Sequence, residues 1–152
     1  WALGGLPTDA PVLVLGAGGA ARAAVDTLSR RGTVIVSARR PEAANTLLEL
    51  GADSSVPWGA GVGGAVVVNA TPLGMSGEPL PVAVLEGASG YLEMVYAPEV
   101  TPGVQVAEGL GLPIGWGIDM LVGQAAASFA RWFGMEPPIA EMTSAAKRSS
   151  TP

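Results

Sequence analysis

The sequence predicts an α/β fold in which a doubly wound parallel sheet lies between two layers of helices, a three-layer αβα arrangement in a single domain. Two observations indicate it. Short apolar or β-branched runs alternate with helical segments along the chain, which is typical of parallel strands connected by helices. The apolar run of residues 12–15 also leads directly into the glycine-rich residues 16–21, so a buried strand, a tight turn and a helix start follow one another.

The first half of the chain gives the clearer elements. Residues 12–15 are apolar throughout, as expected of a strand buried on both faces. Residues 20–31 predict an alanine-rich helix that stops at a glycine, and residues 33–37 are β-branched and predict the second strand. Residues 41–50 predict the next helix, with a proline in its first turn. This half therefore reads as strand, helix, strand, helix.

The second half is expected to complete the sheet. The remaining strands are predicted over residues 54–56, 65–69, 91–96 and 112–114, and the remaining helices over residues 104–110 and 118–133. The end of the last helix carries bulky aromatic side chains, which predicts close packing, either against this sheet or against another part of the protein. Residues 143–152 are small, polar and basic, and we expect them to form a disordered tail that follows a domain of residues 1–142.

Composition excludes several kinds of site. The 152 residues include no cysteine and no histidine, which removes disulfides, thiolates and the commonest general base, and we predict no metal site. The net charge of −5, with eight basic residues, argues against a nucleic-acid surface. No apolar stretch reaches the ~20 residues of a membrane span. The chain starts at Trp1 without a signal-peptide pattern, so we expect a cytoplasmic chain that is a fragment, a processed form or an excised domain.

The glycine loop is predicted to bind the phosphates of a dinucleotide in a Rossmann-like fold. Gly16 permits the tight turn, Gly18 lets a pyrophosphate approach the backbone, and Ala21 lets helix and strand pack closely. The helix N-terminus adds amide donors and positive potential. The alternative is an ordinary glycine-rich turn without a ligand. The residues expected to contact the cofactor here are Gly16, Ala17, Gly18, Gly19 and Ala20.

Two arginines indicate which dinucleotide binds. Arg39 and Arg40 follow the second predicted strand, where the adenosine ribose lies in such proteins and where an NAD-binding protein carries Asp or Glu. The nearest acid, Glu42, comes after Pro41. Because guanidinium groups match a 2′-phosphate, the pair favours NADP over NAD. A solvated basic turn is the alternative.

Three further loops fall at the same edge of the predicted sheet. Residues 69–75 follow the fourth strand, Tyr96 ends the fifth, and residues 113–124 follow the sixth. The carboxyl ends of parallel strands meet at one edge, beside the dinucleotide crevice. Residues 69–75 alone would serve equally well as a tight loop capped by Asn69. Three loops together predict a site.

These residues resemble the shikimate dehydrogenase family, in its NADP-binding domain, over about residues 11–142. The glycine loop is generic, but three further motifs are specific in their order and spacing. They are residues 69–75 (Asn-Ala-Thr-Pro-Leu-Gly-Met), 96–98 (Tyr-Ala-Pro) with 101–102 (Thr-Pro), and 120–125 (Met-Leu-Val-Gly-Gln-Ala). Where the family has Asn-Arg-Thr after the second strand, this chain has Ala-Arg-Arg, so only Arg39 carries over. Glu93 and Asp119 replace a family Asp and a family Gly.

The resemblance implies a reversible, NADPH-dependent reduction of 3-dehydroshikimate to shikimate, in the biosynthesis of chorismate and the aromatic amino acids. The residues that it implies for cofactor contact are Asn69, Thr71, Pro72, Met75 and Met120. It implies Tyr96 and Gln124 for substrate contact. The family's catalytic Lys and Asp belong to a separate N-terminal domain, which would share the substrate with this chain. In the family the last helix borders that domain, so the resemblance implies an exposed apolar patch at the end of this helix.

The composition also indicates, independently of the resemblance, that the chain lacks a proton donor for the reaction. A carbonyl reduction needs an acid held against the developing alkoxide, yet the single lysine, Lys147, lies in the tail and there is no histidine. We therefore predict no catalytic residue in this chain and no activity of the chain alone. The alternatives are a quinate or quinate/shikimate dehydrogenase that uses NAD(P), and a non-catalytic NADP-binding module. The sequence leaves the oligomeric state open, a homodimer included.

Overall fold

The computed structural model describes residues 5–149 and contains one sheet of parallel strands in the order β3-β2-β1-β4-β5-β6. The strands are β1 (Val12–Leu15), β2 (Val34–Ser37), β3 (Ser54–Val56), β4 (Val66–Asn69), β5 (Gly90–Glu93) and β6 (Ile114–Gly115). The chain builds outward from β1 to β3 and then crosses back to β4, so the strand order reverses between β1 and β4. The predicted α/β, doubly wound fold is confirmed. Its ligand crevice is expected beyond the carboxyl ends of these two strands.

The register brings the ends of the central strands to one level. Leu15 lies opposite Ser37 on β2 and opposite Asn69 on β4. Two backbone bonds extend the pairing by one residue: the Gly16 N–H donates to the Ser37 carbonyl over 2.8 Å, and the Ala70 N–H donates to the Leu15 carbonyl over 3.0 Å. The three loops that follow therefore leave the sheet side by side.

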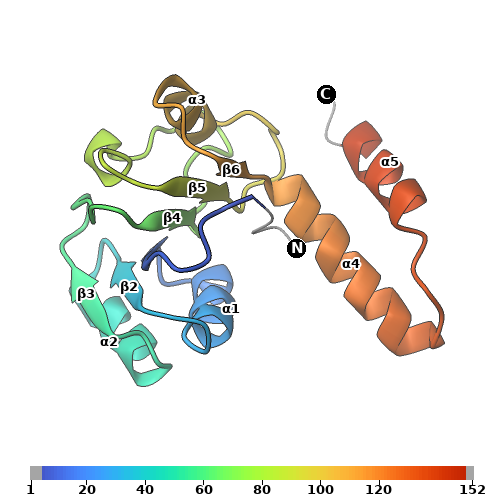
Figure 1. Ribbon diagram of the computed structural model, residues 1–152, viewed down its shortest axis with the longest axis horizontal. Helices are drawn as coiled ribbons and strands as arrows, with labels where there is room; N and C mark the ends of the chain where they lie inside the picture. Colours follow the sequence, from blue (N-terminus) through green and yellow to red (C-terminus); the bar gives the residue numbers. More distant parts are fainter. Residues whose placement is uncertain (1–4, 150–152) are drawn as a thin grey trace.

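Helices cover both faces of the sheet, as Figure 1 shows. The helices are α1 (Gly19–Leu28), α2 (Pro41–Glu49), α3 (Pro102–Gly109), α4 (Gly117–Phe133) and α5 (Ile139–Ser149), with a 3₁₀ turn η1 (Val82–Val84). Val14, Val36 and Val68 pack with α1 and α2 on one face. Leu13, Leu15 and Val67 pack with η1 and α3 on the other. Strands buried on both faces explain why their sequences are continuously apolar.

The two C-terminal helices, α4 and α5, lie side by side and extend away from the sheet (Figure 1). The start of α4 is tied to the sheet at Gly117, where a Cβ would overlap the Val95 carbonyl. Gly134 ends α4 in the left-handed conformation, with φ of 63°. Among residues 5–149, no helix has the length and apolar character needed to cross a bilayer.

Helix α5 corrects the expectation of a disordered tail. The helix runs to Ser149, and residues 150–152 lie outside the described residues. Thr143 donates its hydroxyl to the Ile139 carbonyl over 2.9 Å, and Arg148 donates to Ser144 Oγ over 2.8 Å, four residues back in each case. Small polar composition suggested disorder. Alanine's high helix propensity and the packing of α5 along α4 explain the helix instead.

Candidate functional site

Two adjoining clefts open at the carboxyl edge of the sheet. The first, which we call the arginine cleft, has a volume of about 470 Å³ and is lined by residues 16–18, 38–40, Ala43, Trp58 and 70–72. These come from the loops after β1, β2, β3 and β4. Its position at the β1–β4 reversal is where open α/β sheets bind ligands.

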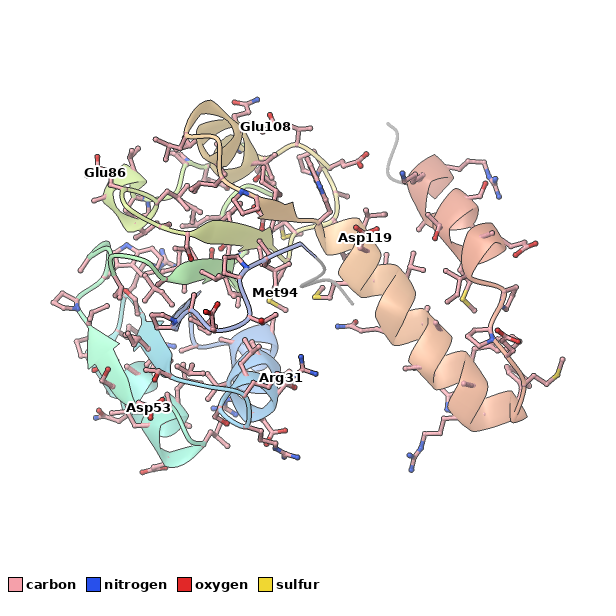
Figure 2. All side chains as sticks on the ribbon, viewed as in Figure 1. Arg31, Asp53, Glu86, Met94, Glu108 and Asp119 are labelled. Atoms are coloured by element: carbon pink, nitrogen blue, oxygen red, sulfur yellow. The ribbon has the colours of Figure 1, made fainter. Side chains whose placement is uncertain are left out.

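The second, which we call the tyrosine cleft, has a volume of about 310 Å³. It is lined by Ala20, residues 70–72, Met75 and residues 94–97, so it lies after β4 and β5. Met75 and Tyr96 are 59% and 47% exposed. Met94, labelled in Figure 2, also packs against the α1 side of the core. Residues 70–72 line both clefts, which makes them two compartments of one elongated site.

The glycine loop forms the floor of the arginine cleft with its backbone. Gly16 has φ of +106°, and a Cβ there would lie 2.9 Å from the Ala70 carbonyl oxygen, so only glycine fits. Gly18 caps α1 without a side-chain hydrogen bond, and a Cβ at Gly18 or Gly19 would meet no atom within 4 Å. The start of α1 therefore has no side-chain cap and has open space beside it, and the free amides of a helix N-terminus suit an anion.

Two guanidinium groups stand beside this floor. Arg39 and Arg40 are exposed and follow the end of β2. Within residues 5–149, neither forms an ion pair or a side-chain hydrogen bond; the ion pair found there joins Arg30 to Asp26 over 2.9 Å. The cleft thus combines helix amides with two uncommitted positive charges, and it can hold a ligand with more than one phosphate.

Asn69 shapes the loop between the clefts and lines neither of them. Its side chain is fully buried, and Oδ1 accepts the Thr71 N–H over 3.1 Å and the Thr71 hydroxyl over 2.6 Å. Nδ2 donates to the Leu73 carbonyl over 3.1 Å. The cofactor contact of Asn69 stays a prediction; in the structure its side chain holds Thr71 in the wall that the two clefts share.

A buried carboxylate, Glu93, joins this loop to the loop after β5. Its side chain is 1% exposed. Oε1 accepts from Asn69 Nδ2 over 2.9 Å and from the Val95 N–H over 3.0 Å. Oε2 accepts from the hydroxyls of Tyr91 and Thr101, each over 2.7 Å. Four donors compensate the burial of the carboxylate. The bond to Val95 also explains why β5 ends at Glu93, short of the predicted 96.

Tyr91 and Thr101 are held firmly by this arrangement. Tyr91 is fully buried, and burial, followed by the negative charge of Glu93, raises the pKa of its phenol. Thr101 caps α3, where its hydroxyl also accepts the Val104 N–H over 3.2 Å. A Cβ at Gly74 would lie 2.9 Å from Thr101 Cβ, so the two loops touch here as well. Glu93 appeared at the sequence level only as a departure from a family pattern. An acid at the end of an apolar strand was the signal for its role.

Four predicted residues line neither cleft: Gly19 at the start of α1, Asn69 as described above, and Met120 and Gln124 on α4. Gln124 on α4 lines a separate apolar groove between α4 and α5, of about 430 Å³, with Phe129, Trp132 and Met142 among its neighbours. Met120 also lies on α4, next to Asp119, which Figure 2 labels. The described residues therefore do not bring Gln124 into a cleft with Tyr96. Conversely, Trp58 lines the arginine cleft and was not predicted.

The described residues place no carboxylate, lysine or histidine in either cleft, and they form no metal centre. Across residues 5–149, no three Asp or Glu side chains gather as they would around a metal ion. The single lysine, Lys147, lies on α5. The titratable group that lines the clefts beside the two arginines is the Tyr96 phenol.

Several known proteins are similar to this chain in both sequence and fold. A family model described as the shikimate 5′-dehydrogenase C-terminal domain matches residues 117–147. A shikimate dehydrogenase (NADP⁺) of Pyrobaculum aerophilum is 39% identical over 151 residues, which cover 93% of this chain and 56% of that protein. A crystal structure of shikimate 5-dehydrogenase from Thermus thermophilus, in complex with NADP(H) and shikimate, matches with a TM-score of 0.86 and 37% identity.

These matches include nearly all of this chain but only part of each known protein. The Thermus match includes 97% of this chain and 59% of the Thermus chain. A quinate dehydrogenase from Corynebacterium glutamicum, in complex with NAD, matches with a TM-score of 0.79 and 27% identity, over 97% of this chain and 57% of that one. The chain thus spans a little over half the length of these proteins.

Proposed function

The chain belongs to the shikimate dehydrogenase family, and we propose that its two clefts together bind one molecule of NADP(H). In this proposal it is the cofactor-binding part of an enzyme that interconverts 3-dehydroshikimate and shikimate. The observation that carries the proposal is the pairing, in one cleft, of the uncapped α1 N-terminus with the uncommitted Arg39 and Arg40.

The residues of the arginine cleft suit the phosphates of NADP. The amides of residues 16–18 and the start of α1 offer donors to the pyrophosphate. Arg39 follows β2, where the adenosine ribose is expected, and its guanidinium can meet the 2′-phosphate with paired donors. NAD offers only a hydroxyl there, and the position after β2 carries no acid to accept from it.

The tyrosine cleft then receives the nicotinamide end. NADPH, when bound, supplies the hydride for the reduction. Met75 and residues 94–97 give this end apolar walls, and the shared residues 70–72 position it relative to the phosphates. Tyr96 stands exposed at the rim, where it can reach a substrate. We place the proton donor outside this chain, since the clefts hold neither lysine nor histidine.

An exposed apolar face supports a partner for this chain. Trp132, Phe133 and Met135 are 76%, 61% and 62% exposed at the end of α4, which confirms the expected apolar patch. We propose that this face packs against the part of the enzyme that corresponds to the unmatched remainder of the relatives. A homodimer and a cytoplasmic location complete the proposal. Gln124 would reach substrate only in such an assembly.

Titration of the chain with NADPH and NADH tests the proposal. We expect NADPH to bind more tightly, and Arg39→Ala to weaken NADPH roughly tenfold to a hundredfold, because a charge-assisted contact contributes about 1.5–3 kcal/mol. NADH affinity should stay unchanged. Arg31→Ala, at an exposed arginine labelled in Figure 2 and outside both clefts, is the matched control. Equal binding of the two cofactors, or none, contradicts the proposal.

Two other functions remain to be distinguished from this one. The likeness to an NAD-bound quinate dehydrogenase favours, as second candidate, a quinate/shikimate enzyme that uses NAD(P). Tighter NADH binding would support it. A non-catalytic NADP-binding module is favoured by the lack of a lysine or histidine in the clefts. Shikimate and NADP⁺ added to the chain alone should give no NADPH absorbance. Turnover would show that the chain contains its own catalytic residue.

A further inference from the structure

Trp58 supplies the aromatic ring in the wall of the arginine cleft, among the described residues. The ring is partly buried, and it packs against the apolar cluster on the α3 side of the sheet. Part of its surface is therefore fixed by the core while part faces the cleft. Neither the proposed phosphate contacts nor the tyrosine cleft uses this residue.

The backbone around Trp58 holds the ring in place. The Ala60 N–H donates to the Pro57 carbonyl over 3.0 Å and closes a four-residue turn with Trp58 second and Gly59 third. Gly59 has φ of +86°, as the third position of a type II turn requires. The fully buried Ser37 also donates its hydroxyl to the Pro57 carbonyl over 3.1 Å. The turn that carries Trp58 is thus bonded to the last residue of β2, two residues before Arg39.

The strand order assigns the parts of a dinucleotide to positions along the cleft. Neighbouring strands β3, β2, β1 and β4 deliver, in that order, Trp58, the arginines, the glycine loop and residues 70–72. Pyrophosphate at the glycine loop and ribose phosphate at the arginines leave the β3 end for the base. Ala38, after β2, and Ala43, on α2, line the same cleft with small side chains, so no bulky group there competes with a flat ring for the indole.

We propose that the adenine ring of the cofactor stacks on the indole face of Trp58, which makes Trp58 an adenine-binding residue. The proposal rests on the proposed function, because it takes NADP(H) as the ligand. Stacking on an aromatic ring depends on its π face and needs no hydrogen-bond donor. A ring fixed in advance by its turn loses little freedom when the base arrives.

Binding of adenosine 2′,5′-bisphosphate tests the stacking, because this probe carries the adenine and the 2′-phosphate without the nicotinamide. We expect Trp58→Ala to weaken the probe and NADPH by the same factor, about tenfold or more, as for stacked bases elsewhere. Trp58→Phe keeps a π face and should keep most of the affinity. Trp116→Ala is the matched control, since Trp116 packs against the same cluster and lines neither cleft. The probe should also quench tryptophan fluorescence, and Trp58→Phe should remove that quenching.

The outcomes separate the two proposals. If the chain prefers NADPH and Trp58→Ala binds it as tightly as the wild type, stacking is wrong and the proposed function stands. If Trp58→Phe loses as much affinity as Trp58→Ala while circular dichroism shows both folded, the indole serves packing alone and stacking is again wrong. If the wild-type chain does not bind NADPH, the proposed function fails and the stacking proposal fails with it.

Discussion

The two clefts share residues 70–72 but are built in different ways. The charge of the arginine cleft comes from backbone amides and from two exposed side chains, Arg39 and Arg40, that form no ion pair or side-chain hydrogen bond in residues 5–149. The wall of the tyrosine cleft stands on a buried hydrogen-bond network centred on Glu93. Substitution of the two arginines should therefore change the affinity for a ligand but not the stability of the fold. Substitution in the network under the tyrosine cleft should change both.

Under the proposed function, the difference follows from what each compartment would hold. Phosphates bring their own charge, so amides and exposed guanidinium groups suffice to bind them, and solvent can satisfy exposed groups without a ligand. A nicotinamide ring presents little charge, and its placement depends on the shape of the loops. Glu93 fixes the loops after β4 and β5 at one point, which gives that shape at the cost of burying a carboxylate.

Glu93→Ala should give the largest effect. It removes the acceptor of four donors, and leaving buried donors without partners should lower the free energy of unfolding by about 3–5 kcal/mol. Urea denaturation followed by circular dichroism measures the loss. Arg39→Ala, in the other cleft, should stay within about 0.5 kcal/mol of wild type, as exposed substitutions do. Equal stability of the two variants would end the distinction between the clefts.

Two glycines of the arginine cleft sharpen the comparison. Gly16→Ala puts a Cβ 2.9 Å from the Ala70 oxygen at a left-handed φ, and should cost about 1–3 kcal/mol of stability. Gly18→Ala meets no atom within 4 Å and has φ of −77°, so stability should change by less than about 0.5 kcal/mol. Its methyl group would instead stand where the proposed function places the pyrophosphate, so NADPH affinity should fall. Thermal unfolding and NADPH titration of both variants separate the two effects, and a stability loss at Gly18 would contradict the assignment.

The sequence was informative where local rules decide the structure. The strand over residues 33–37 and the glycine turn after β1 were predicted because β-branched runs and a strand–glycine–helix order have few alternative interpretations. Helix α5 was missed because its stability comes from packing along α4, which composition does not report. Contacts between residues far apart in the sequence were the other feature that could not be predicted. That Asn69 bonds inward to Glu93, or that Trp58 reaches the cleft from β3, depends on how distant strands are ordered.

Tyr91→Phe should give the smallest of the three losses of stability, after Glu93→Ala and Gly16→Ala, and it adds a dependence on pH. Losing the hydroxyl's bond to Glu93 should cost about 1–1.5 kcal/mol near pH 8.

Because the folded state raises the pKa of Tyr91, the stability that this residue contributes in the wild type is complete below the unfolded pKa of about 10 and declines above it. Phenylalanine cannot ionise, so the gap between wild type and variant should shrink by about 1.4 kcal/mol between pH 9 and pH 11. Urea unfolding at both pH values measures the change. Tyr96→Phe, at the exposed tyrosine of the loop after β5, is the control and is expected to follow wild type. Parallel pH profiles for wild type and Tyr91→Phe would mean that the phenol ionises as easily in the folded chain as in the unfolded one. The network under the tyrosine cleft would then be no more closed to water than the arginine cleft beside it.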